Sequence, residues 1–342
     1  MAYFLVIPAA GKATRAMAFT GFGTTPKPFI SIGGNTVFGL IMEEARSAKI
    51  DELALIVDSK ERANLYKHYF DPFLDAPELK ENVAKKAPDA IARIEKEQQM
   101  NVHYTYQQEP LGFGHAVGLV YPIIKEKNHD GIIVALGDDL ICSKSSGMEQ
   151  LIEVHKKTGG MVCMLEKVTR EDAKRFGVAQ ISEILDSKEL TCQKLFRVGS
   201  VQEKPQKPTP NIIDEQEFYF AIAGRYLLEE EDLEYLFNAP SSKGDELDFS
   251  SLFARNIAKG RLTAILPEGN FHTVGNSMDL QKAAISFALH SDNSNVFDEL
   301  LTHTLHELYS IGVLHEEDSL SEKFSLNPTL AKQLKTAILS KK

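Results

Sequence analysis

A run of small residues close to the start of the chain has the composition of a phosphate-binding loop. Residues Tyr3–Pro8 form a short apolar segment typical of a strand, and Ala-Ala-Gly-Lys-Ala-Thr-Arg follows at positions 9–15. Small residues let backbone N–H groups approach phosphate oxygens, and Arg15 and Lys27 could then neutralise the outer phosphates of a nucleotide. An ordinary turn between a strand and a helix would have the same composition, so both interpretations stay open here.

A second segment suited to a ligand follows another strand-like run. Residues 107–117 are Gln-Gln-Glu-Pro-Leu-Gly-Phe-Gly-His-Ala-Val. Gly112 and Gly114 allow a ligand to lie against the main chain. Gln107 can pair with the amide edge of a nucleobase, accepting from N3–H and donating to O4. A loop whose proline and glycines serve only a turn is the alternative.

Two adjacent carboxylates end a predicted buried strand. The apolar residues 133–136 lead into Gly137, Asp138 and Asp139. Carboxylates in this position suit Mg²⁺, which takes one or two protein carboxylates together with substrate phosphates. An Asx turn or a helix N-cap would explain the same residues without a metal.

The composition is that of an ordinary soluble globular protein and excludes several classes. The 342 residues are 43% hydrophobic and 25% charged, with a net charge of -10. Without a dense Lys/Arg stripe we expect no nucleic-acid partner. Without an apolar run of roughly 20 residues or a signal peptide we expect no membrane association. Three cysteines without metal-ligand spacing indicate reduced thiols in the cytoplasm.

Strand-like and helical segments alternate along the first half of the chain, which predicts an α/β fold with a mixed, mostly parallel sheet flanked by helices. Ligands of such sheets bind beyond the carboxyl ends of the strands, so the opening loop and the two aspartates are expected to face one crevice. A peripheral helical segment is expected at 71–100, and further helices from about Ser291. The clearest strands are Tyr3–Pro8, Leu53–Val57, Val102–Tyr106, Ile132–Leu136 and Phe218–Leu228, and the clearest helices are Thr36–Ala48 and Gly114–Ile124.

In this order the pieces resemble the bacterial UTP–glucose-1-phosphate uridylyltransferases (UDP-glucose pyrophosphorylases) of the sugar nucleotidyltransferase superfamily. The resemblance covers residues 3–290. It implies a Rossmann-like nucleotide-diphospho-sugar transferase fold with a nucleotide half at 1–140, a sugar-side half at 141–290 and a C-terminal helical extension at 291–342. Further matching segments are Phe176-Gly177-Val178, Glu203-Lys204-Pro205, Ala223-Gly224-Arg225-Tyr226, Gly244-Asp245-Glu246 and Gly275.

The resemblance also implies a reaction and a role for each residue. UTP and glucose 1-phosphate would give UDP-glucose and pyrophosphate, with Mg²⁺ as cofactor. The sugar phosphate would attack the α-phosphate in line, and a phosphomonoester that is largely dianionic near pH 7 needs no general base. The implied nucleotide contacts are Gln107 with the backbone of Ala9, Ala10, Gly11 and Gly112; Arg15 and Lys27 would hold the β- and γ-phosphates, Asp138 the metal, Gly177 and Glu203 the glucose, and Lys204 its phosphate.

Several positions depart from the family pattern. The second glycine of the opening loop is Ala13, and Arg15 and Lys27 are two residues further apart than usual. Thr273 stands where the family has a second metal-binding aspartate, so either Asp139 or water fills the gap, or the metal site is weakened. Tyr219 replaces an asparagine and Asp248 a glutamine, both expected toward the sugar.

Three alternatives to this function were compared with it. One is the same chemistry with dTTP or another sugar 1-phosphate. Another is a catalytically degenerate paralogue that binds a sugar nucleotide and regulates a partner. An NAD-linked dehydrogenase is disfavoured because no G-x-G-x-x-G follows the first strand. We expect a homo-oligomer, in which the helices after Ser291 could either pair subunits or cover their own sheet.

Overall fold

The computed structural model describes residues 2–11, 26–32, 34–242, 244, 246–290 and 296–310. Arg15, Ala13 and Asp245 therefore lie outside the described residues. The chain divides into two compact units, residues 1–283 and 284–342. Within the described ranges, no helix is both long enough and apolar enough to span a bilayer.

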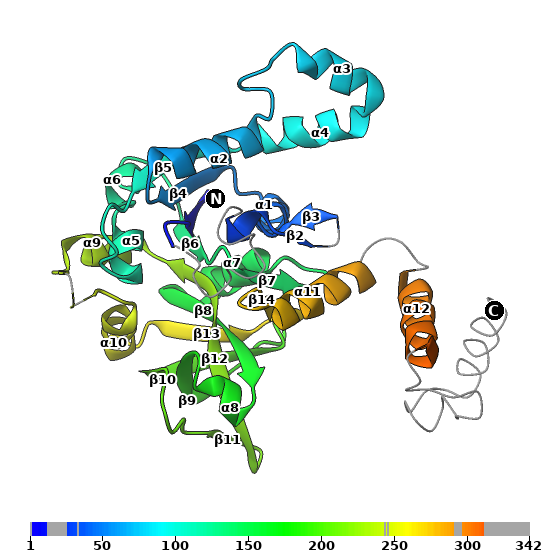
Figure 1. The fold of residues 1–342 in the computed structure, drawn as a ribbon. Helices are drawn as coiled ribbons and strands as arrows, with labels where there is room; N and C mark the ends of the chain where they lie inside the picture. The colour runs from blue at the N-terminus through cyan, green and yellow to red at the C-terminus, as the bar shows by residue number, and fades with distance from the viewer. Residues whose placement is uncertain are drawn as a thin grey trace. The chain divides into compact units, whose positions relative to one another are not determined.

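Four parallel strands form one part of a large mixed sheet (Figure 1). At its centre Leu5 pairs with Leu53 on one side and with Ile133 on the other. The inner strands are buried along their length, which explains their continuous runs of apolar residues. The predicted strands are confirmed here to within one residue at either end, in the order β5 (Asn101–Tyr106), β4 (Glu52–Val57), β1 (Tyr3–Pro8) and β6 (Gly131–Ala135).

The rest of the sheet closes into a ring of five strands. The antiparallel strand β12 pairs with β6 through Arg225–Leu228 and with β9 through Phe220 and Ala221. It pairs with β8 on both sides of an irregularity between Ile222 and Tyr226. Since β8 pairs with β13, β13 with β10, and β10 with β9, the pairing returns to β12. Parallel pairing is thus limited mainly to the four strands above. The ring consists of β12 (Gln216–Leu228), β8 (Met161–Val168), β13 (Leu262–Leu266), β10 (Lys194–Glu203) and β9 (Gly177–Leu185).

Short elements join these parts. The pair formed by β7 and β14 places Asp139 opposite Thr273. A turn of 3₁₀ helix, η2, begins at Lys27 directly after Pro26. The short elements are β2 (Ser31–Ile32), β3 (Asn35–Thr36), β7 (Asp139–Cys142), β11 (Asn211–Ile213), β14 (Asn270–Thr273) and η2 (Lys27–Phe29).

Helices cover the sheet. One apolar core joins Ile132 and Val134 of β6 to α5, α6, α9 and α10, while α7 packs on β8 and β12 and also contacts α1. The single helix predicted at Gly114–Ile124 is wrong, because the chain forms two helices there and Pro122 has no N–H with which to continue the first. These helices are α1 (Val37–Ser47), α2 (Lys60–Phe70), α5 (Phe113–Gly118), α6 (Tyr121–Ile124), α7 (Gly147–Thr158), α8 (Arg170–Ala173), α9 (Glu230–Asn238) and α10 (Ser250–Ala258).

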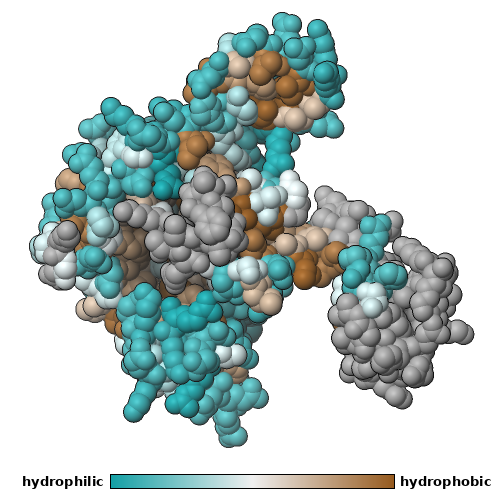
Figure 2. Space-filling view, in the orientation of Figure 1, coloured by the Kyte–Doolittle hydropathy of each residue, from teal (hydrophilic) through white to brown (hydrophobic). Residues whose placement is uncertain are grey.

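The segment predicted to be peripheral and helical at 71–100 is confirmed. It contains α3 (Leu79–Lys86) and α4 (Pro88–Glu97), which pack against each other away from the ring (Figure 1). No residue of α3 is buried, and apolar side chains gather on this projection (Figure 2). Further along, α11 (Ser277–Leu289) crosses the boundary between the two units, and α12 (Val296–Ser310) belongs to the second.

A fully buried arginine, Arg225, joins β12 to α1 and to the turn after β6. Arg225 of β12 is 0% exposed, and its guanidinium donates to the carboxylate of Glu44 in α1, with Nη2 2.9 Å from Oε2. The same guanidinium donates to the backbone oxygens of Leu136, Gly224 and Asp139, at 3.3, 3.1 and 2.8 Å. The guanidinium thus connects both ends of the turn that carries Asp138 with β12 and with α1.

Removal of this guanidinium should be among the most destabilising single changes in the protein. Arg225→Met leaves a buried carboxylate and three carbonyls without their donor, so we expect the free energy of unfolding to fall by about 3–5 kcal/mol. Glu44→Leu together with Arg225→Met should lose less than the sum of the two single changes. Arg62→Met, which breaks the part-exposed pair with Asp58, is the control and should cost less than about 1 kcal/mol. Chemical denaturation measures all four; additive losses would mean that Arg225 acts independently of Glu44.

Candidate functional site

The residues predicted from scattered motifs meet in one cleft of about 540 Å³. Lys27 follows the opening loop, Gly112 precedes α5, and Asp138 follows β6. Gly177 begins β9, Glu203 is the last residue of β10, and Lys204 directly follows it. The cleft therefore draws on both the parallel strands and the ring. The predicted residues that line it are Lys27, Gly112, Asp138, Gly177, Glu203 and Lys204.

A lysine–aspartate pair lies at the carboxyl end of the parallel strands. Lys27 Nζ lies 2.8 Å from Asp138 Oδ2, and the lysine side chain is only 10% exposed. A Cβ atom at Gly137 would lie 3.8 Å from the carbonyl oxygen of Pro8, the last residue of β1. The turn after β6 and the end of β1 thus adjoin one another, and both had been expected to face one crevice because both follow strands.

Asp139 and Thr273 stand directly behind this pair. They are register partners between β7 and β14, and the N–H of Val274 donates to the carbonyl oxygen of Asp138 at 2.8 Å. Burial and the neighbouring Asp138 carboxylate raise the pKa of Asp139 to about 7, although Arg225 and Thr273 oppose the shift. A buried carboxylate directly beside a partly exposed one is an arrangement whose repulsion a divalent cation relieves.

The donor set suits magnesium better than a metal that needs several protein ligands. No group of three or more His, Cys, Asp or Glu side chains suited to a metal occurs among the described residues. Mg²⁺ takes one or two carboxylates and completes its shell with water and substrate phosphate. Asp138 and Asp139, with the Thr273 hydroxyl beside them, fit that requirement.

A bulge in β12 makes room for the aspartate turn. Between Ile222 and Tyr226 the strand takes four residue steps, whereas β8 takes two over the matching stretch. Gly224 lies within this bulge, where a Cβ atom would stand 2.3 Å from Asp139 Oδ2. The Gly224 carbonyl accepts from the N–H of Leu136 at 2.8 Å. Only glycine lets the turn approach the strand this closely.

The loop at 107–112 is fixed by its own contacts. Gln107 Nε2 donates to the carbonyl oxygen of Gly112 at 3.0 Å and lies 3.1 Å from His115 Nδ1. Leu247 accepts a hydrogen bond from Gly114 and donates one to Leu111, which ties the loop to the segment before α10. Gln107 is not among the residues that line the cleft, but it supports Gly112, which is.

On the ring side, Glu203 and Lys204 lie beside Gly177. The ammonium of Lys204 is 3.0 Å from Glu203 Oε1, and a Cβ atom at Gly177 would lie 3.2 Å from Glu203 Oε2. Lys204 has a φ of +40°, a conformation that costs a non-glycine residue of order 1–3 kcal/mol. Its N–H donates to the Phe176 carbonyl oxygen at 3.1 Å. Strain of this kind concentrates at functional sites.

The remaining predicted contacts of the opening loop are only partly available. Ala9 donates its N–H to the carbonyl oxygen of Ile56 at 2.7 Å, so only its carbonyl is left for a nucleotide. Ala10 is partly exposed and Gly11 is exposed at the end of β1. Arg15 lies outside the described residues.

Asp248 and Tyr219 were both expected to lie toward the sugar, and of the two only Asp248 lines the cleft. Asp248 lines the cleft, and its carboxylate accepts from the N–H and hydroxyl of Ser250 at 2.7 and 3.0 Å. The expected place of Tyr219 is wrong: its side chain packs in the small apolar cluster of Val168, Ala173 and Val178, on the strand face opposite to Phe220.

Sequence reasoning did not assign a role to Arg175, although it lines the cleft. Its guanidinium lies 3.6 Å from a carboxylate oxygen of Asp172 and from one of Asp279. A lone arginine before Phe176-Gly177 gives no signal by itself. Its position two residues before β9, next to Phe176 and Gly177, is the feature that brings it to the cleft.

The close approach at Gly112 can be tested. With φ at +104° and a built Cβ 2.2 Å from the Leu247 carbonyl oxygen, Gly112→Ala must displace the loop. We expect a loss of more than about 3 kcal/mol in the free energy of unfolding. Gly34→Ala is the matched control, because Gly34 has φ +85° but nothing within 4 Å, and it should lose about 1 kcal/mol. Equal losses in chemical denaturation would show that conformation alone requires Gly112.

Known proteins are similar to this chain over most of its length, both in sequence and in fold. The chain is 29% identical over 286 residues to the UTP–glucose-1-phosphate uridylyltransferase of Staphylococcus epidermidis strain RP62A, covering 83% of this chain and 91% of the relative. It is 27% identical over 317 residues to the enzyme of the same name from Bacillus subtilis strain 168, covering 92% and 97%. The fold matches a UTP-bound UGPase from Acinetobacter baumannii with a TM-score of 0.71 at 22% identity, over 88% of this chain and 98% of the other. The family model described as nucleotidyl transferase matches residues 5–288, and the chain belongs to that family.

Proposed function

We propose that this protein transfers a uridylyl group from UTP to glucose 1-phosphate, giving UDP-glucose and pyrophosphate. The observation that carries the proposal is the cleft itself, which places the Lys27–Asp138 pair and the Glu203–Lys204 pair along one cavity. The names of the similar bacterial enzymes support the choice of UTP and glucose 1-phosphate.

The proposed reaction gives each of these residues a role. An oxygen of the glucose 1-phosphate attacks the α-phosphorus of UTP, and the bond from that phosphorus to the bridging oxygen breaks. Pyrophosphate leaves with the bonding electrons. Lys204 holds the attacking phosphate, whereas Lys27 and Arg15 hold the departing one. Alignment and charge neutralisation then supply the rate.

The remaining residues select the substrates. Gln107, with its Oε1 still able to accept, reads the N3–H of uracil, while the backbones of Ala9, Ala10, Gly11 and Gly112 flank the nucleotide. Glu203 and Gly177 contact the glucose hydroxyls.

Asp138, with Asp139 behind it, would hold Mg²⁺. A magnesium ion there supplies positive charge to the phosphate oxygens of the nucleotide. Lys27 Nζ lies 2.8 Å from Asp138 Oδ2. A complex of magnesium and nucleotide that enters the cleft would therefore find the Lys27 ammonium beside its phosphates and the Asp138 carboxylate beside its metal.

The two sides of the cleft correspond to a nucleotide half at about 1–140 and a sugar-side half at about 141–290, with 291–342 as an extension. Lys27, Gly112 and Asp138 come from the first; Gly177, Glu203 and Lys204 come from the second. Three cysteines without metal-ligand spacing are typical of reduced thiols, so we place the reaction in the cytoplasm, and we expect a homo-oligomer.

The test is pyrophosphate release from the purified protein with Mg²⁺. UTP, dTTP, CTP, ATP and GTP are each paired with glucose 1-phosphate and with several other sugar 1-phosphates. Release with UTP and glucose 1-phosphate supports the proposal and makes Thr273 a tolerated substitution. Release only with another pair keeps the chemistry but replaces the substrates, and would direct attention to Asp248. No release from any pair while UDP-glucose still binds would indicate the degenerate regulatory paralogue.

Lys204→Ala should lower the turnover number by at least about 100-fold, because the ammonium is placed on the attacking phosphate. UTP affinity, measured by calorimetry, should stay within about twofold. Lys207→Ala is the control, since Lys207 is exposed and does not line the cleft. Unchanged turnover in Lys204→Ala would remove this assignment.

Thr273→Asp should strengthen magnesium binding by placing a third carboxylate beside Asp138 and Asp139. We expect the Mg²⁺ concentration for half-maximal pyrophosphate release to fall at least about threefold. Thr209→Asp, on an exposed loop outside the cleft, controls for the added charge. A magnesium response identical to that of the wild type would mean that another ligand already fills the position.

A further inference from the structure

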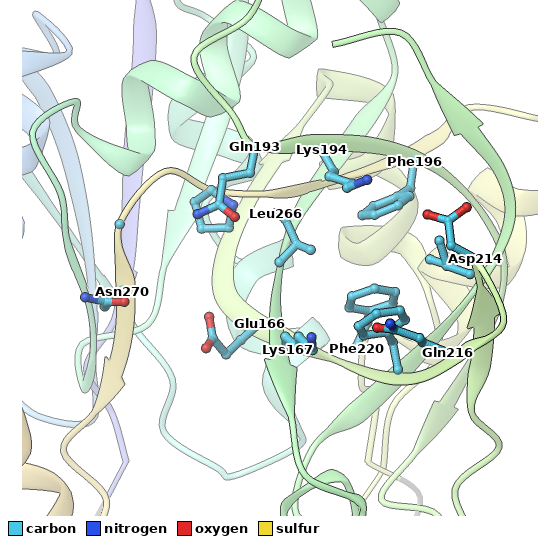
Figure 3. A pocket seen from close by; sticks show the side chains of 14 residues that line it. Glu166, Lys167, Gln193, Lys194, Phe196, Asp214, Gln216, Phe220, Leu266 and Asn270 are labelled. Atoms are coloured by element: carbon cyan, nitrogen blue, oxygen red, sulfur yellow. The ribbon is translucent and has the colours of Figure 1, made fainter. Parts of the chain in front are cut away.

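A second pocket of about 440 Å³ opens where two strands of the ring separate (Figure 3). Strand β8 pairs with β13 only as far as Met164, opposite Ile265. Beyond this point β8 continues along β12, whereas Leu266 stays paired with Lys194 of β10. The gap between the diverging strands is the pocket, which we call the wedge pocket. It shares no lining residue with the cleft.

The inner end of the wedge pocket is aromatic. Phe196 and Phe220 lie inside the ring of strands and are 0% and 2% exposed (Figure 3). Their ring centroids are 5.3 Å apart, and Phe218 lies parallel to Phe220 with centroids 6.0 Å apart. Leu266 is a further apolar wall. A floor of aromatic rings beneath an open mouth is the form of a small-molecule site, and the volume is in the usual range.

One carboxylate in this pocket has no partner. Glu166, on β8, is only partly exposed, and burial alone raises its pKa to about 7. Within the described part of the chain no side chain or backbone group hydrogen-bonds or pairs with it. A half-buried acid without a counter-charge costs stability, and that cost falls when a cation reaches it.

The aromatic wall already attracts positive charge. The ammonium of Lys167 lies over the ring of Phe218, 4.0 Å from its centroid, which is a close cation–π contact. Around the rim, the exposed Lys167 and Lys194 are opposed by the exposed Asp214. The long side chains of the two lysines can turn outward. Glu166 leaves β8 on the face opposite to Lys167 and Phe220, and it lines the pocket from the other side of the gap between the strands.

We propose that the wedge pocket binds a small molecule with a flat aromatic ring and a positively charged nitrogen, the ring against Phe218 and Phe220 and the nitrogen on Glu166. The site is separate from the cleft, so the proposal stands whatever the substrates of the cleft are.

Benzamidine is the probe, because its amidinium can pair with a carboxylate through two N–H groups on a flat ring. Ligand-observed NMR titration of the full chain should give saturable binding with a dissociation constant of about 1 mM or tighter. Benzamide has the same shape without the charge and should bind at least about tenfold more weakly. Absence of saturable binding, or equal affinity for benzamide, would overturn the proposal.

Two variants locate the binding. Glu166→Gln should weaken benzamidine at least about tenfold, and Phe218→Leu should weaken it at least about threefold. Glu217→Gln is the matched control, because Glu217 lies one residue from Phe218 on β12 but does not line the pocket. Thermal unfolding confirms that each variant is folded. Equal affinity of Glu166→Gln and Glu217→Gln would overturn the site.

Discussion

The geometry of the cleft depends on one buried cation. Arg225 cannot be left without partners, since an unpaired guanidinium in the core would cost several kcal/mol. Its hydrogen bonds to Glu44 and to three backbone oxygens therefore fix the distance between α1, β12 and the turn after β6. Asp138 gains its position from this network without touching it through its own side chain. The chemistry of the site thus rests on a residue that no substrate would contact.

The bulge in β12 is the second requirement of the same arrangement. A Cβ atom at Gly224 would lie 2.3 Å from Asp139 Oδ2, so any larger residue at this position would collide with the carboxylate. The extra residues in the bulge also turn the Gly224 carbonyl toward Leu136 and toward Arg225. A local irregularity of the backbone therefore serves both the buried ion pair and the pair of carboxylates.

The sequence allowed prediction of what is local and periodic. Apolar runs located the parallel strands, and the rule that ligands bind beyond their carboxyl ends predicted that the opening loop and the aspartates would face one crevice. Pro122 is a break signal inside the helix predicted at Gly114–Ile124, and the prediction did not take it into account. The ring was beyond such reasoning, because β9 finds both β10 and β12 through long-range pairing. Tyr219 was misplaced for a related reason: adjacent residues of a strand face opposite sides, and only the ring decides which side is the cleft.

The closed ring has a consequence for how this enzyme scaffold can change. In the described part of the chain, β12 pairs with the parallel strands through Arg225–Leu228, and the other ring strands join that sheet by way of β12. Loops between ring strands can therefore lengthen, shorten or be exchanged as a set while the frame that carries Asp138 keeps its register. Under the proposed function, sugar phosphates of new shape would become accessible through changes confined to the ring, while the strands around Asp138 stay the same.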